Sequence, residues 1–314
     1  MKVESEEIMK DKIMPSEAMV CSLKSSMPYG AQATLKLPVT FEGIGTHGGQ
    51  PVTMILHPAE VGKGIVFVRS DVQGQDNKIP ALWNFVSDTR MCTKITNEAG
   101  VSVSTIEHLL SALYACDLDS VRIEINGPEV PIMDGSAQEF IAPLLNAGRT
   151  FLDQPRSVIA IKRPVVVRES EDRWVSIEPA DRLYIECKFD FNGRANFPEQ
   201  TFKGEITPDK FISAIAPART FGFVEDVMHL RSMGLAKGSS LENAVGIQDN
   251  RILNPEGLRF EDEFVRHKVL DIVGDLFTAG FRIHGHLVGT RTGHALSNQL
   301  LRAVFADESN WVIQ

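Results

Sequence analysis

The sequence is poor in cysteine, in tryptophan and tyrosine, and in long apolar runs. Its 314 residues include four cysteines, three tryptophans and three tyrosines. No two cysteines form a C-x-x-C pair, which excludes a disulfide framework and a cysteine-type zinc site and favours a reducing compartment. No apolar run reaches the roughly 18 residues of a membrane helix, and the charged start MKVESEEIMKDK lacks the apolar core of a signal peptide. We therefore expect a cytoplasmic protein with no membrane insertion.

Basic residues are also too few for a protein that binds nucleic acids. Lysine and arginine number 32 against 41 aspartates and glutamates, which gives a net charge of −9. Such a surface repels phosphate backbones, although a local basic pocket for a small anionic ligand stays compatible with it. The hydrophobic share of 43% and the charged share of 23% are those of a globular protein. At about 100–200 residues per domain, the length indicates two domains.

The first part of the chain has a β pattern that ends in one helix and one further strand. Residues 1–30 have no periodicity, and we expect them to form a loose N-terminal arm. Apolar residues at helical spacing from Ile106 to Leu113 predict a helix that begins near Ser104. A glycine-rich turn is expected at 43–49, and strands are expected at 34–41, 52–56, 64–69 and 120–126.

A second round of the same order begins near Asp153. The run Lys162–Val165 echoes Lys36–Val39, and Ile177–Ala180 echoes Leu56–Ala59. These matches are short, but the order of elements predicts an α+β fold of two similar two-layer α/β sandwich domains that arose by internal duplication. We expect the domains to cover residues 31–152 and 153–314. A site at their interface would take side chains from both.

The second half contains more helical material than the first. Helices are expected at 211–216, 224–233, 259–279 and 295–305, strands at 184–191 and 283–289, and a loop-rich insertion at 234–246. In the helix at 259–279, His267, Asp271 and Asp275 stand at i, i+4 and i+8 and therefore share one face. A histidine and a carboxylate four residues apart can bind one metal ion. The same spacing also fits an ordinary ion pair on a solvated face.

Glu107 and His108 form the second candidate pair. His108 can be a metal ligand with Glu107 as the adjacent base. Alternatively, Ser104-x-x-Glu107 is a capping box and His108 has a structural role at the helix start. His294 has both readings too, as a catalytic residue or as a helix cap. Asp134-Gly135 is expected to fix the region between the domains, and Thr220-Phe221 to pack in a strand. No Walker A, G-x-G-x-x-G or H-E-x-x-H motif is present.

Taken together, these segments resemble the UDP-3-O-acyl-N-acetylglucosamine deacetylase family, the zinc amidases of lipid A biosynthesis. The resemblance runs in order from about residue 33 to about residue 305. It is carried by Gly43–Gly49, Thr105–Leu113, Ile132–Ala137, Ala218–Phe223, Gly257–Lys268, Asp271, Gly274–Leu276 and Gly293–Leu296. The sequence departs from the family pattern at Thr46, where leucine is usual, at Gly193 after Asp190-Phe191-Asn192, where the family often has His-Pro, and at Arg291-Thr292, which replaces a usual Lys-Ser.

The resemblance implies one metal ion per chain, Zn²⁺ or Fe²⁺, bound by His108, His267 and Asp271. It implies Glu107 as the general base and His294 as the general acid, which Asp275 would orient. Thr220 would stabilise the oxyanion, and the segment 221–247 would form a passage for the acyl chain. Substrate contacts are implied for Lys268 and Arg291 near phosphate, Asp226 at a sugar hydroxyl, Asp190 and Phe191 at the nucleotide base, and for Phe221 and Cys92.

The implied reaction is hydrolysis of the N-acetyl group of UDP-3-O-acyl-N-acetylglucosamine to UDP-3-O-acyl-glucosamine and acetate. It is the committed step of lipid A and lipopolysaccharide biosynthesis in Gram-negative bacteria, and we expect a monomer. Two alternatives belong to other classes. A phosphoesterase usually needs more carboxylates around two metals, and a non-catalytic binding module would purify without stoichiometric metal.

Overall fold

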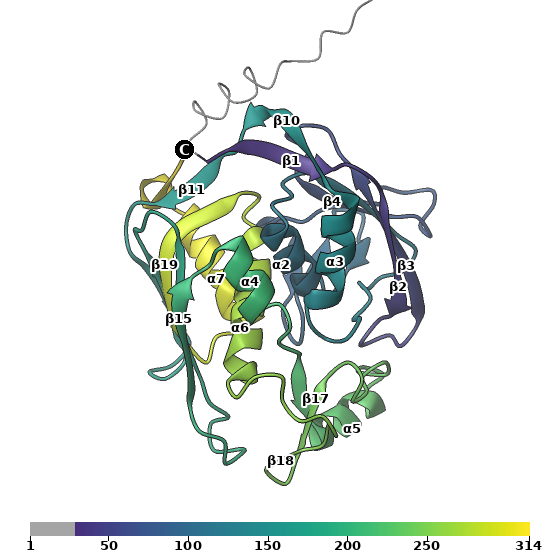
Figure 1. The fold of residues 1–314 in the computed structure, drawn as a ribbon, viewed down its shortest axis with the longest axis vertical. Helices are drawn as coiled ribbons and strands as arrows, with labels where there is room; N and C mark the ends of the chain where they lie inside the picture. Colours follow the sequence, from purple (N-terminus) through teal and green to yellow (C-terminus); the bar gives the residue numbers. More distant parts are fainter. Residues whose placement is uncertain (1–28) are drawn as a thin grey trace, which may run out of the picture.

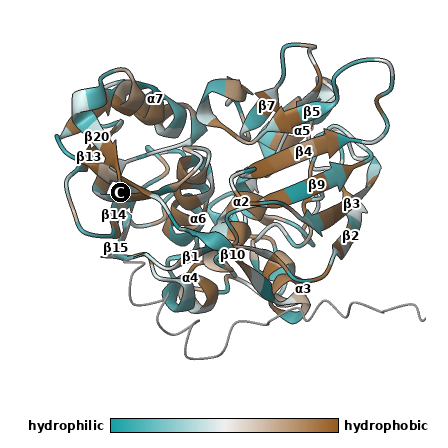
Figure 2. Ribbon diagram, turned by 90° about the horizontal axis from the view of Figure 1, so that it is seen from above, coloured by the Kyte–Doolittle hydropathy of each residue, from teal (hydrophilic) through white to brown (hydrophobic). Residues whose placement is uncertain are grey.

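The computed structural model describes residues 29–314, so all but the last two residues of the predicted N-terminal arm lie outside the described part. Two β-sheets stand on opposite sides of a layer of helices (Figure 1). Seen from above, α2 and α6 lie between the two sheets (Figure 2). The fold is α+β, as the sequence predicts.

The sheet of the first half has five strands. In spatial order they are β2 (Val39–Ile44), β3 (Pro51–Pro58), β9 (Val121–Ile125), β4 (Ile65–Arg69) and β5 (Lys78–Pro80). A smaller sheet of β6 (Val86–Asp88), β7 (Lys94–Thr96) and β8 (Ser102–Val103) precedes helix α2 (Glu107–Ala115). Helix α3 (Gln138–Ala147) follows β9.

In the sheet of the second half, five strands follow one another in space with the same pairing pattern as in the first sheet. These strands are β12 (Val165–Arg168), β13 (Trp174–Glu178), β19 (Arg282–Thr290), β14 (Leu183–Phe189) and β15 (Gln200–Glu205). Strand β19 also pairs with β11 (Val158–Ile161), which pairs with β20 (Trp311–Ile313). Outside the insertion described below, the α-helices of this half are α4 (Pro208–Ala214), α6 (Glu263–Phe277) and α7 (His294–Phe305).

The two sheets have the same connectivity. In each sheet, the second strand of a hairpin pairs antiparallel with a central strand, which is β9 in the first half and β19 in the second. The other side of the central strand pairs in parallel with the first strand of a second hairpin, β4–β5 or β14–β15. A helix precedes the central strand in both halves, α2 before β9 and α6 before β19. This correspondence is what a duplicated unit predicts, and the duplication itself stays a prediction. So does the boundary at residue 153, which falls within β10 (Arg149–Pro155), the partner of β1 (Ala31–Leu35).

Helices α2 and α6 are the buried centre of the molecule. All nine residues of α2 are buried, and so are 13 of the 15 residues of α6. Gly274 lets the two helices approach closely, because a Cβ atom at this position would overlap the carbonyl oxygen of Glu107. The close approach brings the polar face of α6 against the first turn of α2.

Most predicted elements are confirmed, with three corrections. The predicted strand 34–41 is two strands, β1 and β2, because the chain turns away after Leu35 and the amide of Lys36 donates to the carbonyl of Gly148 at 2.9 Å. The predicted helix 259–279 begins only at Glu263. Helix α4 begins at Pro208, before the predicted start, because the Thr207 hydroxyl caps it by accepting from the amide of Lys210.

Residues 221–252, which include the predicted insertion, form a small unit at one end of the molecule (Figure 1). It consists of β16 (Phe221–Phe223), α5 (Val224–Ser232), β17 (Val245–Gln248) and β18 (Arg251–Ile252). Its three strands make a sheet of their own. In residues 29–314, no helix is long and apolar enough to cross a membrane.

Candidate active site

The predicted metal ligands of the two halves meet between α2 and α6. His108 lies in the first turn of α2, and His267 and Asp271 lie one turn apart on α6. The Nε2 atom of His108 is 3.6 Å from Oδ1 of Asp271, and that of His267 is 3.4 Å from the same oxygen. All three side chains are buried, and their ligand atoms lie within 4.8 Å of one another. The structure therefore brings together the three residues that the sequence singles out from separate segments.

This donor set fits a divalent cation. Oδ1 of Asp271 is buried and accepts no hydrogen bond within the described part of the chain, which is costly for a carboxylate oxygen unless a cation lies against it. The Nδ1 atom of His267 is 3.1 Å from the carbonyl oxygen of Ala218. Since a carbonyl only accepts, Nδ1 carries the proton and Nε2 keeps its lone pair. Burial lowers the pKa of His267 to about 3, so the ring is neutral and able to bind a metal.

Two alternative interpretations from the sequence are wrong. His267, Asp271 and Asp275 are at most 4% exposed, so they do not form an ion pair on a solvated face. Ser104 and Glu107 do not form a capping box, because the N-cap position of α2 is Ile106 and its side chain caps nothing. The Ser104 hydroxyl donates to the carbonyl of Pro128 instead.

Glu107 is buried beside the predicted metal ligands. Its Oε2 atom accepts a hydrogen bond from the amide of Thr93 at 3.0 Å, and its Oε1 atom is 3.8 Å from Nε2 of His294. Burial raises the pKa of Glu107. A carboxylate with a raised pKa takes up a proton more readily near neutral pH, which suits a general base.

His294 is the first residue of α7, and Gly293 before it holds the N-cap position, so the reading of His294 as a cap is wrong. Its Nδ1 atom is 3.0 Å from Oδ2 of Asp275. Burial opposes the charged ring, but the carboxylates of Asp275 and Glu107 prevail and raise the pKa of His294 to about 10. The imidazole is therefore protonated at neutral pH and can act as an acid.

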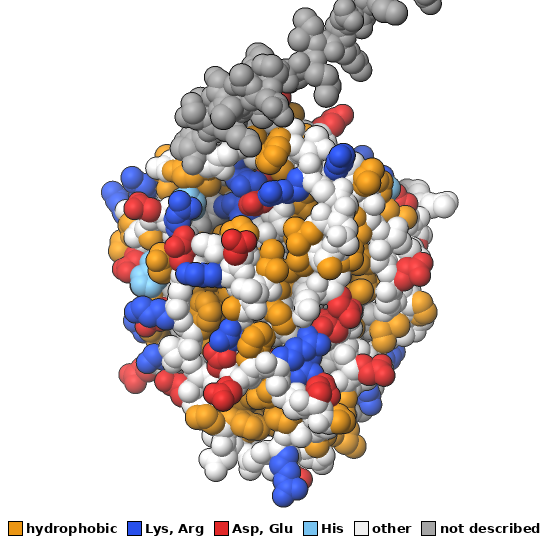
Figure 3. Space-filling model, viewed as in Figure 1, with side chains coloured by type: hydrophobic (Ala, Val, Ile, Leu, Met, Phe, Trp, Pro, Cys, Tyr) orange, Lys and Arg blue, Asp and Glu red, His pale blue; other side chains and the backbone are white. Residues whose placement is uncertain are grey.

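His108, His267, Asp271, Glu107 and His294 line one cavity of about 660 Å³ together with residues of the insertion. Thr220 and Thr46 line it as well, and the buried hydroxyl of Thr46 has no hydrogen-bond partner among residues 29–314. Apolar side chains of the insertion that line the cavity are Met228, Leu230, Leu241 and Leu253. Hydrophobic side chains also gather on the surface at this end of the molecule (Figure 3), where Met228 is 66% exposed. The cavity thus joins a polar centre to an apolar exit.

The predicted substrate contacts have varied surroundings. Lys268 lies at the predicted metal site, with Nζ 2.8 Å from Oδ2 of Asp271. Asp190 accepts from the guanidinium of Arg291 at 3.0 Å, and Phe191 packs in a cluster of phenylalanines with Phe221. Asp226 forms a surface ion pair with Arg194 at 2.8 Å. Except for Arg291, these residues border the cavity. Cys92 is not among the described residues that line it. Burial raises the pKa of the Cys92 thiol to about 12.

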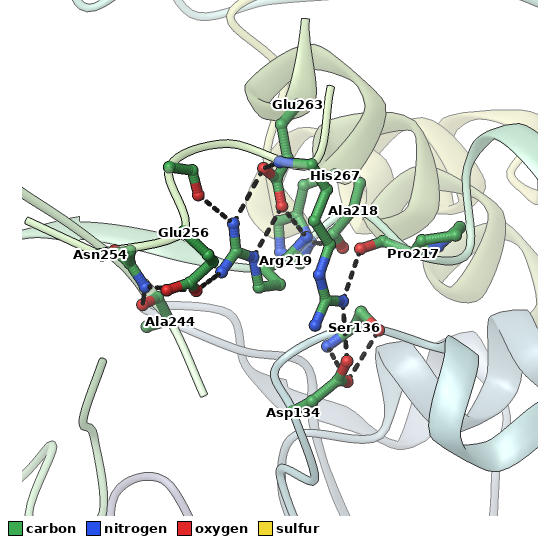
Figure 4. A network of polar contacts seen from close by, with 12 residues as sticks. Asp134, Ser136, Pro217, Ala218, Arg219, Ala244, Asn254, Glu256, Glu263 and His267 are labelled. Carbon is green, nitrogen blue, oxygen red and sulfur yellow. Dashed lines mark hydrogen bonds and ion pairs between the residues drawn. The ribbon is translucent and has the colours of Figure 1, made fainter. Parts of the chain in front are cut away.

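A buried polar network behind the site was not predicted from the sequence. Arg219 is 2% exposed and its guanidinium is bound by the carboxylates of Glu263, at 2.9 Å, and Glu256 (Figure 4). The network fixes the segment whose Ala218 carbonyl meets His267. No local pattern marks Arg219 and Glu263 as partners, since they lie 44 residues apart.

The turn at Asp134-Gly135 connects the two halves, as the sequence predicts. Asp134 accepts from the guanidinium of Arg259 at 2.7 Å, and the carbonyl of Gly135 accepts from the amide of Thr220 at 2.8 Å. Gly135 has a φ of +82°, and a Cβ atom there would overlap the carbonyl oxygen of Asn243. The turn therefore holds Thr220, the residue before β16, against the first half.

Comparison with known proteins gives concordant matches. Residues 32–306 match the family model of LpxC, UDP-3-O-acyl N-acetylglycosamine deacetylase. The chain is 44% identical over 278 residues to the UDP-3-O-acyl-N-acetylglucosamine deacetylase of Photobacterium profundum, covering 88% of this chain and 91% of that protein. It is 44% identical over 283 residues to that of Mannheimia succiniciproducens, with coverages of 89% and 92%. It is 43% identical over 281 residues to that of Shewanella oneidensis, with coverages of 89% and 91%.

Proposed function

The chain belongs to the UDP-3-O-acyl-N-acetylglucosamine deacetylase family, and from this premise we propose how its site carries out the reaction. The protein removes the N-acetyl group of UDP-3-O-acyl-N-acetylglucosamine, a step of lipid A biosynthesis. The observation that carries the proposal is the meeting of His108, His267 and Asp271 around an unpaired buried carboxylate oxygen.

We propose that these three residues hold one Zn²⁺ per chain, with Fe²⁺ as the alternative. Two imidazole nitrogens and a carboxylate oxygen are a donor set that both ions accept, and three protein ligands leave a position open for catalysis. When bound, such an ion polarises the amide carbonyl and makes water a stronger nucleophile at neutral pH.

Glu107 and His294 divide the proton transfers between them. Glu107 takes a proton from the water that attacks the acetyl carbonyl. Protonated His294 stabilises the oxyanion that forms and then donates its proton to the departing amine, which leaves poorly as an anion. Asp275 keeps His294 charged and oriented through the Nδ1 contact of 3.0 Å. Thr220, which also lines the cavity, is proposed to assist at the oxyanion.

The cavity suggests how the substrate is held. Its apolar side, formed by the insertion, suits the 3-O-acyl chain, because burial of each methylene contributes about 0.8 kcal/mol. We propose that Lys268 and Arg291 lie near the phosphates and that Asp190, Phe191, Phe221 and Asp226 contact the nucleotide and sugar. Since Arg291 and Asp226 have ion-pair partners, these contacts require the two side chains to separate from Asp190 and Arg194. The cytoplasmic location and the monomeric state stay predictions.

Chelation is the test of the proposed function. Acetate release from UDP-3-O-acyl-N-acetylglucosamine is expected to fall to background after treatment with a chelator, because the proposed ion both polarises the amide carbonyl and activates the attacking water. Addition of Zn²⁺ or Fe²⁺ to the dialysed protein should restore the rate, and the more effective ion identifies the metal. The account is wrong if the metal-depleted protein keeps its rate. Release of nucleotide phosphate without acetate would favour a phosphoesterase, and absence of any product would favour a binding module.

A further inference from the structure

Thr93 uses each of its polar groups at the candidate active site. Its hydroxyl donates to Oδ1 of Asp275 at 2.6 Å, and its amide donates to Oε2 of Glu107 at 3.0 Å. Its carbonyl accepts from the amide of Ile106, the residue before Glu107, at 3.4 Å. One residue therefore contacts the general base, the start of the helix that carries it, and the carboxylate that orients the general acid.

The two donated hydrogen bonds restrain the carboxylates on either side of His294. The Thr93 hydroxyl donates to Oδ1 of Asp275, and Nδ1 of His294 lies 3.0 Å from Oδ2 and 3.2 Å from Oδ1 of the same carboxylate. The Thr93 amide occupies Oε2 of Glu107, and the free Oε1 is the oxygen that lies 3.8 Å from Nε2 of His294. Thr93 thus sets the rotation of both carboxylates that flank the imidazole.

Thr93 is well placed to hold this geometry rigidly. It is 3% exposed, so water has little access to replace its hydrogen bonds. It directly precedes β7, which pairs with both β6 and β8. Hydrogen bonds to charged groups are among the stronger ones, and a buried carboxylate that loses such a donor is free to rotate.

We propose that Thr93 is a positioning residue that holds Glu107 and the Asp275–His294 pair in one fixed relation. The inference rests on the catalytic roles proposed above for Glu107 and His294. Thr93 acts on the chemical step, because its hydroxyl and amide are both directed at catalytic carboxylates. It has no part in metal binding, since none of its polar groups contacts His108, His267 or Asp271 in the described hydrogen bonds.

The test compares variants that keep the hydroxyl with variants that lack it. Thr93→Val keeps the shape and the amide but removes the donor to Asp275, and Thr93→Ser keeps the donor. Thr93→Val is expected to lower kcat for acetate release about 10- to 100-fold, the range for a lost hydrogen bond to a charged group. KM and bound metal should stay within about twofold, and Thr93→Ser should recover most of the rate. The pair Thr93→Ser and Thr93→Ala gives the same comparison if Thr93→Val does not fold.

A second arm separates positioning from a structural role. In a His294→Ala background, Thr93→Val is expected to change kcat less than about twofold, because the acid through which the hydroxyl acts is gone. A wild-type kcat for Thr93→Val, or equal losses in the serine and alanine variants, would overturn the inference. So would an undiminished effect in the His294→Ala background. Wild-type protein assayed in parallel reports on the proposed function itself, so failure of that function is seen separately as absent acetate release.

Discussion

Replacing His108 or His267 with alanine is expected to abolish metal binding and acetate release together. The site takes one imidazole from α2 and another from α6, so neither half alone supplies the donor set. Loss of an outer-shell partner already costs 10- to 100-fold in metal affinity, and loss of a direct ligand should cost at least that much. Metal content by mass spectrometry and the rate of acetate release, measured on the same preparations, check the prediction.

His286 provides a matched control. It lies on β19, where its ring is 3.2 Å from Glu178 and partly exposed, and it is not among the residues that line the cavity. His286→Ala should keep both the metal and the rate. If His108→Ala behaved like His286→Ala, with full metal content and rate, a metal site between the two halves would be wrong.

Replacing His294 with alanine is expected to lower kcat/KM by about 10²–10⁴-fold while the metal content stays full, the usual range for one acid–base group. The pH profile of the wild-type protein should be bell-shaped, because the base must be ionised while the acid is protonated. The rate rises as Glu107 loses its proton and falls as pH increases through the pKa of His294, which its carboxylate neighbours raise to about 10. Since these groups interact, the two limbs give macroscopic values.

Asp275→Asn separates this explanation from a simple loss of packing. The amide is nearly the same size but no longer favours the charged imidazole, so the alkaline limb should move to lower pH. In His294→Ala the alkaline limb should flatten or shift. A His294→Ala protein with the wild-type rate and an unchanged alkaline limb would exclude His294 as the acid, and Glu107 in both roles would become the first candidate.

The sequence predicts the centre of the site because its residues follow local rules. His267, Asp271 and Asp275 share a face through the helical period alone, and this face is the one that α2 covers. The sequence leaves open whether this polar face of α6 is solvated or buried. That depends on the packing of two helices that begin 156 residues apart along the chain, and Gly274 marks the contact without identifying its partner.

Other features were missed because tertiary contacts override local patterns. Ser104 and Glu107 have the spacing of a capping box, but Thr105 has a φ of +58° and its hydroxyl donates to Glu129 at 3.1 Å. The backbone before α2 is thus set by partners in other elements. Thr93 and Asp275 are separated by 182 residues, and no spacing or composition connects them. Sequence patterns and the family resemblance point to the proposed reacting groups, and the groups that contact them, such as Thr93, become visible only in the fold.

Anomalous diffraction from crystals of the active protein, recorded at the zinc and iron absorption edges, tests the central claim most directly. The account predicts one anomalous peak per chain, enclosed by Nε2 of His108, Nε2 of His267 and Oδ1 of Asp271. Loss of this peak after chelation should accompany loss of acetate release. Crystals of fully active protein with no peak at this position, or with the only peak at other donors, would contradict it.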